Sequence, residues 1–335
     1  MLRKRTTLSV VLLFSIMFTF PAIANTDVIS AIRTSDLPKV KEFLSKGVNP
    51  NSITDKYERT TLIFEALKDR DTRVLQALID AGATANYSTK KGRLCERVPL
   101  AVAVYQRNLP AVKVLLAAKA EPNFDTSFKE PILSCVDFRF DDSPQFVDTL
   151  LTAGASVKDS KIMLLRAIEH QRAEAVVQLL KAGIDPNSKE GFTKHPFFAF
   201  HSTASSDETA LTLMTKALLE AGANPSVRDE RGNTPILALN RGFTPFTNAS
   251  LYNAKGMISL LVQAGCDINA KNNNIETLLY LIVKSDRSEV SRAFDSIKFA
   301  LELGADPTIP SVNGEVPLDM VQDRAVKVMM KSYVK

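Results

Sequence analysis

The chain has 335 residues, of which 45% are hydrophobic, so it can bury a substantial core. Only 7% are aromatic and tryptophan is absent, and the apolar residues form Leu, Ala, Val and Ile stripes at helical spacing, which favours an all-α fold. The formal net charge is +5, but Lys and Arg are interleaved with Asp and Glu, which argues against the concentrated basic surface of a nucleic-acid-binding protein.

The first 24 residues have the pattern of a signal peptide. Three basic residues at 3–5 precede an apolar run at 8–20, and Ala22-Ile23-Ala24 is a small-x-small cleavage site. We expect a mature chain that starts at Asn25; removing the three basic charges from +5 leaves +2. The apolar run is short for a membrane span and no second one follows. We therefore expect a periplasmic protein without a stable membrane anchor, or alternatively a secreted one.

Residues 25–335 contain a recurring pattern of helix ends and helix starts. A glycine follows an apolar stripe repeatedly, where a chain that leaves a helix often adopts a left-handed conformation. These positions are Gly47, Gly82, Lys119 in place of glycine, Gly154, Gly183, Gly222, Gly265 and Gly304. Helix starts follow at Thr60-Thr61-Leu62, Val98-Pro99-Leu100, Glu130-Pro131-Ile132, His195-Pro196-Phe197, Thr234-Pro235-Ile236 and Val316-Pro317-Leu318.

These motifs resemble the ankyrin repeat. The helix starts resemble the Thr-Pro-Leu opening of that family, and segments such as Leu218–Asn224 match its Leu-Leu-x-x-Gly-Ala-x-x-Asn ending. The spacing of the helix ends scatters around the period of about 33 residues of that family. The resemblance implies an all-α solenoid of helix-turn-helix units with short β-hairpin fingers. The family's His after Thr-Pro-Leu is absent, and the interval 154–183 is too short for a full finger, which predicts imperfect stacking and a bend at the fifth repeat.

We divide the chain into eight repeats and a C-terminal cap that form one array. The expected repeats lie near 26–51, 52–86, 93–123, 127–158, 159–187, 191–227, 231–270 and 273–307, with the cap at 313–335.

The three cysteines, Cys95, Cys135 and Cys266, are widely separated and form no metal-binding or redox motif. Export would place them in an oxidising compartment, where one pair could be bridged. Because a solenoid keeps distant repeats apart, we expect most of the possible pairings to be ruled out.

Catalytic motifs are missing from the sequence. The histidines, His170, His195 and His201, do not lie at metal-binding or nucleophile spacing, and there is no phosphate-binding glycine loop. Acids such as Asp229 are expected to be solvated. We therefore predict no enzyme activity, no metal and no cofactor; the alternative is an enzyme with a site within 190–250.

The resemblance implies a groove, formed by fingers and first helices, that binds another protein. Two insertions, at 137–144 and 240–252, are further candidates, since long loops in a repeat often carry binding residues. The alternative is that their Phe side chains pack back over the solenoid. Phe197 and Phe198 are expected in the core. The candidate contact residues are Tyr57, Lys91, Arg93, Phe138, Arg139, Phe192, Arg228, Glu230, Arg231, Arg241, Phe243 and Phe246.

The leading hypothesis is therefore a non-enzymatic, exported bacterial protein that is monomeric when unbound and binds a partner protein. In its sharper form it is an immunity protein that neutralises a periplasmic toxin. The alternative is a secreted effector that acts on a host protein.

Overall fold

The computed structural model describes residues 25–55, 57, 59–89, 92–124, 131–158, 160–188, 195–200, 207–239, 248–285 and 293–334. Contacts divide the chain into an N-terminal part, residues 1–84, and a C-terminal part, residues 85–335. The predicted signal peptide lies outside the described residues, among which no helix is both long and apolar enough to cross a membrane.

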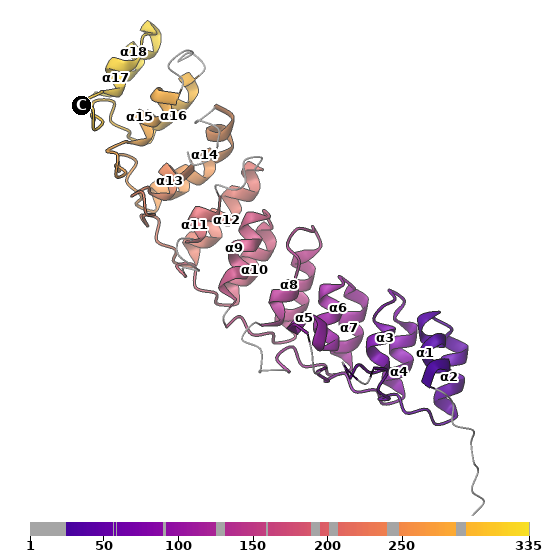
Figure 1. The fold of residues 1–335 in the computed structure, drawn as a ribbon. Helices are drawn as coiled ribbons and strands as arrows, with labels where there is room; N and C mark the ends of the chain where they lie inside the picture. Colours follow the sequence, from indigo (N-terminus) through magenta and orange to yellow (C-terminus); the bar gives the residue numbers. More distant parts are fainter. Residues whose placement is uncertain are drawn as a thin grey trace, which may run out of the picture. The chain divides into compact units, whose positions relative to one another are not determined.

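The N-terminal part consists of two helix pairs (Figure 1). The first pair is α1 (Asn25–Arg33) and α2 (Leu37–Ser45), and the second is α3 (Leu62–Ala66) and α4 (Thr72–Asp80). The two first helices, α1 and α3, pack against each other, and so do the two second helices, α2 and α4. The carboxylates of Asp36 and Asp71 accept hydrogen bonds from Lys39 N and Arg73 N, so each second helix starts with a capping aspartate.

The C-terminal part continues the same arrangement, and Figure 1 shows its helix pairs following one another in chain order. Its second helices from α8 to α18 pack in series, as do most of its first helices. The elements are α5 (Leu94–Arg97), α6 (Pro99–Tyr105), α7 (Leu109–Ala117), the 3-10 helix η1 (Ile132–Cys135), α8 (Ser143–Thr152), α9 (Lys161–Glu169), α10 (Ala173–Lys181), α11 (Pro196–Ala199), α12 (Glu208–Glu220), α13 (Pro235–Ala238), α14 (Asn248–Gln263), α15 (Leu278–Ser285), α16 (Phe294–Glu302), α17 (Pro317–Met320) and α18 (Arg324–Lys331). The all-α prediction is confirmed.

The helix-ending positions adopt the left-handed backbone that the sequence predicts. Gly82 has φ +92°, and Lys119 takes φ +61° at the equivalent position despite its side chain. Lys119 N donates to Leu116 O at 2.9 Å and Ala120 N to Leu115 O at 2.9 Å, which ends the helix with the same bonds as at the glycine turns.

The core is formed by the predicted apolar stripes. Phe197 and Phe198 are 1% and 3% exposed, as expected. The fifth repeat, with its short interval, still forms a full pair, α9 and α10, of 9 residues each.

The fingers are turns without regular strands in the described residues, where we expected β-hairpins. The arms pair over one or two residues: Ile53 and Thr61 form an isolated bridge, and Asp229 N donates to Asn233 O at 3.0 Å. The Asp229 carboxylate also accepts from Arg231 N and Asn233 N at 2.7 and 3.0 Å. Because the next helix cap, Thr234, follows at once, no residues remain to extend a ladder.

An asparagine clamp joins consecutive repeats. Asn123, four residues after Lys119, donates from Nδ2 to Gly154 O at 2.9 Å and accepts at Oδ1 from Ser156 N at 2.9 Å. The same pair of bonds recurs from Asn51, Asn86, Asn187 and Asn269. Lys158 occupies this position before the fifth repeat and has no carboxamide to form the clamp.

Candidate partner-binding cleft

The first helix of the fourth repeat is a short 3-10 helix, and a cleft lies beside it. Only four residues form η1 between α6 and α9, which both contact it. Val136 then leaves the helix in an extended conformation, with φ −74° and ψ 126°, and the Phe138 side chain beyond it is buried, 2% exposed. The resulting cleft has a volume of about 900 Å³; it is lined by residues 92–96, Tyr105, residues 134–139 and the end of α9 with His170.

One wall of the cleft is closed by a disulfide between Cys95 and Cys135, with a Cα–Cα distance of 5.5 Å. Our expectation that a solenoid rules out most pairings does not apply to this pair, because α5 is an additional helix at the start of the third repeat that lies against η1 of the next. Arg97 Nε donates to Thr89 O at 2.7 Å and holds α5 on its own finger. Cys266 is free and buried, and burial raises its pKa to about 11, so it is a neutral thiol at physiological pH.

The loop 137–142 is held by arginines from both neighbouring repeats. From the fifth repeat, Arg172 donates to Phe138 O at 2.9 Å and Arg139 O at 2.7 Å, and it pairs with Asp141 at 2.5 Å. From the third, Arg107 pairs with Asp142 at 2.8 Å and stacks 3.5 Å from the centre of the Phe140 ring. The loop is therefore fixed before any partner arrives.

Two of the predicted contact residues lie on this loop, and one prediction is wrong. Phe138 is part of the core and cannot contact a partner in this structure. The Arg139 side chain is 70% exposed and pairs with Asp137 at 2.6 Å. The hydrogen bond from Arg139 lowers the pKa of Asp137, which keeps this carboxylate ionised.

Sequence reasoning missed two aromatic side chains at this site. Phe140 is 39% exposed and Tyr105 is 61% exposed. Alternation would place Phe138 and Phe140, two residues apart, on the same side of the loop, whereas one is buried and the other exposed. The loop turns between them, so no local signal in the sequence distinguishes the two rings.

Arg93 joins Arg139 in the cleft lining, whereas the other described candidates lie elsewhere. Tyr57 is 83% exposed on a finger of the N-terminal part. Arg228 donates to Gly232 O and Lys271 O at 2.6 and 2.7 Å, so it links two fingers. Glu230 and Arg231 are exposed at the finger tip. Lys91, Phe192, Arg241, Phe243 and Phe246 lie outside the described residues.

His195 has a structural role. It is 2% exposed, its Nδ1 accepts a hydrogen bond from Phe197 N at 3.3 Å, and its Nε2 lies 3.2 Å from Asn187 Oδ1. It therefore caps α11 and contacts the asparagine clamp. His170 is exposed at the edge of the cleft, and no group of three potential metal ligands occurs within the described ranges.

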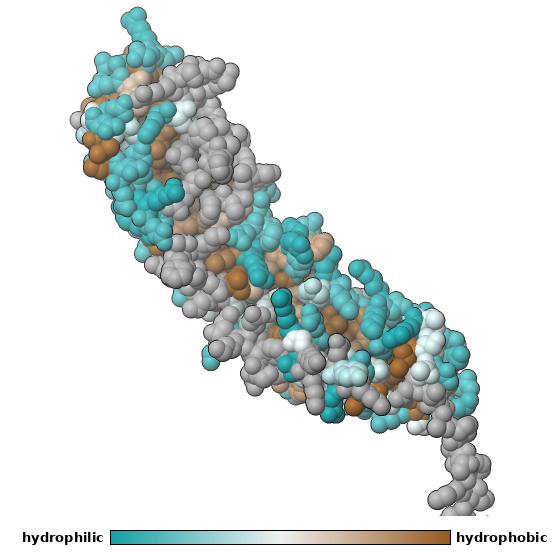
Figure 2. Space-filling model, in the orientation of Figure 1, coloured by the Kyte–Doolittle hydropathy of each residue, from teal (hydrophilic) through white to brown (hydrophobic). Residues whose placement is uncertain are grey.

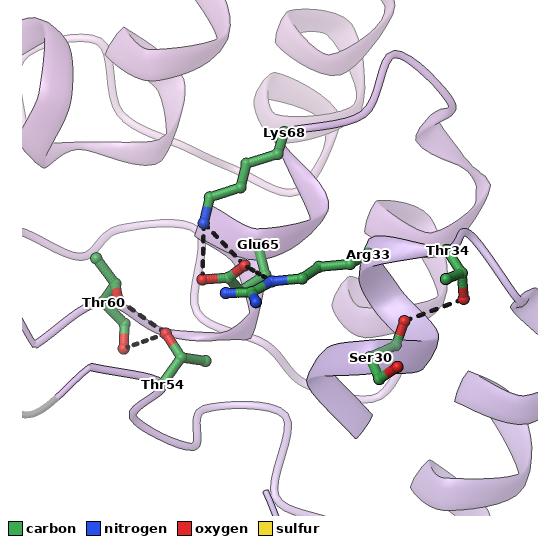
Figure 3. Close-up of polar contacts among 7 residues, drawn as sticks. All are labelled: Ser30, Arg33, Thr34, Thr54, Thr60, Glu65 and Lys68. Atoms are coloured by element: carbon green, nitrogen blue, oxygen red, sulfur yellow. Dashed lines mark hydrogen bonds and ion pairs between the residues drawn. The ribbon is translucent and has the colours of Figure 1, made fainter. Parts of the chain in front are cut away.

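A polar cluster joins the first two repeats in the N-terminal part (Figure 3). The Glu65 side chain, 6% exposed, lies between Arg33 Nε and Lys68 Nζ, each 2.9 Å away. Burial by itself raises the pKa of Glu65, but the hydrogen bonds from Arg33 and Lys68 outweigh it, so the pKa lies below its ordinary value. The cluster therefore links the first repeat to the second.

Two parts of the chain match family models of the ankyrin repeat. A model of three ankyrin repeats matches residues 28–126, and a single ankyrin repeat matches residues 241–273. The chain contains ankyrin repeats. The ankyrin repeat protein YahD of Escherichia coli K12 is 27% identical over 221 residues, which are 65% of this chain and 90% of YahD. An ankyrin repeat protein of Rickettsia felis is 45% identical over 56 residues, 16% of this chain and 22% of that one.

The crystal structure of the human ASB11 ankyrin repeat domain shares the fold, with a TM-score of 0.50 and 22% identity over 68% of this chain and 96% of that domain. Ankyrin repeats are scaffolds for protein–protein interaction and are generally not catalytic, so the exposed surface of the array is where function is expected. In Figure 2 the coloured surface is mostly hydrophilic, with separate hydrophobic patches, which is consistent with selective binding.

Proposed function

We propose that this ankyrin-repeat protein is a non-enzymatic scaffold that binds one partner protein on the loop 137–142 and the adjoining cleft. The observation that carries the proposal is the fixation of that loop by Arg107 and Arg172. Binding a partner on a rigid loop loses little conformational entropy, and exposed Arg and aromatic side chains, here Arg139 and Phe140, are the types that dominate interface energies.

The proposal includes export to the periplasm, or alternatively secretion. Two observations support it: the signal-peptide pattern of residues 1–24 and the bridge between Cys95 and Cys135. Disulfides form and persist in oxidising compartments and are rare where thioredoxin and glutathione keep thiols reduced. The two observations are independent, because one concerns the leader and the other the folded array.

In its sharper form, the protein is an immunity protein that blocks a periplasmic toxin by covering its active site. A scaffold without catalytic machinery suits inhibition by steric occlusion, since rigid surfaces bind tightly without chemistry. The alternative is a secreted effector that binds a host protein. Cell fractionation separates the two, because the immunity protein stays in the periplasm and the effector appears outside the bacterium.

The test is whether the affinity-tagged chain captures a partner protein from a periplasmic extract. The same capture is repeated with a double variant, Arg139→Ala with Phe140→Ala. Loss of two interface anchors should weaken partner binding by more than about tenfold. The matched control is Lys113→Ala, on an exposed position of the second helix α7, which should bind as the wild type does. Equal capture by all three proteins, or no partner in any extract, would overturn the proposal.

A further inference from the structure

Two arginines line the cleft without an acidic partner. Arg93 lies at the start of α5 and Arg166 lies on α9, elements that each contact η1. Neither guanidinium is within ion-pairing distance of a carboxylate in the part of the chain that the structure describes, whereas Arg139 in the same lining is paired with Asp137. Both Arg93 and Arg166 are exposed and accessible to a ligand.

Three carboxylates also line the cleft, as many as its guanidiniums. Asp137 is neutralised by Arg139, and a Glu96 carboxylate oxygen accepts a hydrogen bond from Arg93 N at 3.3 Å, within its own helical turn. Glu169, one turn after Arg166, offsets one positive charge. The lining is therefore formally neutral, and what it offers a ligand is the two guanidiniums of Arg93 and Arg166, which pair with none of the described carboxylates.

The size of the cleft suits a segment of polypeptide. The buried side chains of Val136, Phe138 and the bridged Cys135 form the packed base beneath the cleft, and the residues open to a ligand are those of its rim. Ser134 belongs to the same lining, but its Oγ is shielded from solvent. A volume of about 900 Å³ falls within the range of about 300–1,000 Å³ that is typical of ligand-sized sites.

We propose that the cleft receives an acidic segment of the partner protein, whose Asp or Glu carboxylates pair with Arg93 and Arg166. This rests on the proposed scaffold function and adds the chemistry of the partner to it. Arginine is suited to the role because its planar guanidinium binds a carboxylate through two parallel hydrogen bonds.

The experiment measures fluorescence anisotropy of three labelled peptides that differ only in charge, (Gly-Glu)5, (Gly-Gln)5 and (Gly-Lys)5, with the full mature chain at low salt. We expect (Gly-Glu)5 to bind most tightly and to weaken as salt is added. Arg93→Gln with Arg166→Gln should lower that affinity by about fivefold or more. The lysine pair, Arg93→Lys with Arg166→Lys, should retain most of it, and Lys113→Gln controls for net charge.

Equal binding of (Gly-Glu)5 and (Gly-Gln)5, or an equal loss in the Lys113→Gln control, would overturn the acidic-segment proposal. Circular dichroism of each variant checks that the fold is intact. Capture of the partner from the extract separates this proposal from the scaffold function. If the wild type and the double variant, Arg93→Gln with Arg166→Gln, captured the partner equally, the pairing of these arginines with an acidic segment would be refuted. The scaffold function would then still stand. Absence of any partner would refute the scaffold itself.

Discussion

Arginine side chains in this array have different roles that depend on what lies within their reach. Arg228 and Arg172 both donate to backbone carbonyls of a neighbouring repeat and thereby join repeats, while Arg139 extends into solvent. Residue type and position on a finger or loop predicted Arg139 and Arg228 as surface residues, and made no prediction for Arg172. They could not predict which guanidinium binds the backbone of another repeat, because that depends on carbonyl groups 33 to 43 residues away in the chain.

The buried carboxylate of Glu65 should make stability depend on pH in the acid range. Its pKa is lower in the folded chain than its ordinary value of 4.5, so the stabilisation is fully present above that pH and is lost as the pH falls through the folded pKa. Glu65→Gln should lower the free energy of unfolding at pH 7 by about 1–2 kcal/mol and flatten its fall below pH 4.5.

Urea unfolding at several pH values measures both effects. The control is Glu42→Gln, which removes an exposed carboxylate paired with Lys46 on the same helix; it should change stability little. If the unfolding free energy of Glu65→Gln fell at acid pH as steeply as that of the wild type, the Glu65 cluster would not contribute to stability.

At the scale of elements, helix ends were predictable and the η1 region was not. Glycine turns, capping residues and apolar stripes act within a few residues, so the sequence predicts the starts at Pro196, Pro235 and Pro317. The early end of η1 depends on the burial of Phe138 and on Arg172 from the next repeat. Both are tertiary contacts that no local pattern contains, and for this reason the cleft was not foreseen.

The asparagine clamp should contribute measurably to stability. Asn123→Ala removes two hydrogen bonds to the next repeat and leaves Gly154 O and Ser156 N to water, so we expect a loss of about 1–2 kcal/mol of unfolding free energy. Hydrogen exchange should accelerate locally at the Gly154 turn. Asn187→Ala should behave alike, whereas Lys158→Ala, at a clamp position without a carboxamide, should cost much less than either.

At the scale of the whole molecule, the disulfide between Cys95 and Cys135 is a long-range constraint that the repeat pattern of the sequence did not predict. It closes a loop with a sequence separation of 40 residues, and restricting such a loop in the unfolded chain stabilises a protein by about 2–4 kcal/mol. Cys95→Ser with Cys135→Ser should lower the unfolding free energy by that amount. A reducing agent should destabilise the wild type equally and leave the double variant unchanged; a wild type insensitive to reduction would contradict this role.

The same bridge also determines how the protein responds to mechanical force. If the chain were pulled from its two ends, tension would pass from Cys95 directly to Cys135, and the segment between them would not extend. At about 3.5 Å for each extended residue, a separation of 40 residues would shorten the fully unfolded contour by about 140 Å in the oxidised protein. In an optical trap, the added length on reduction would count the residues enclosed by the bridge.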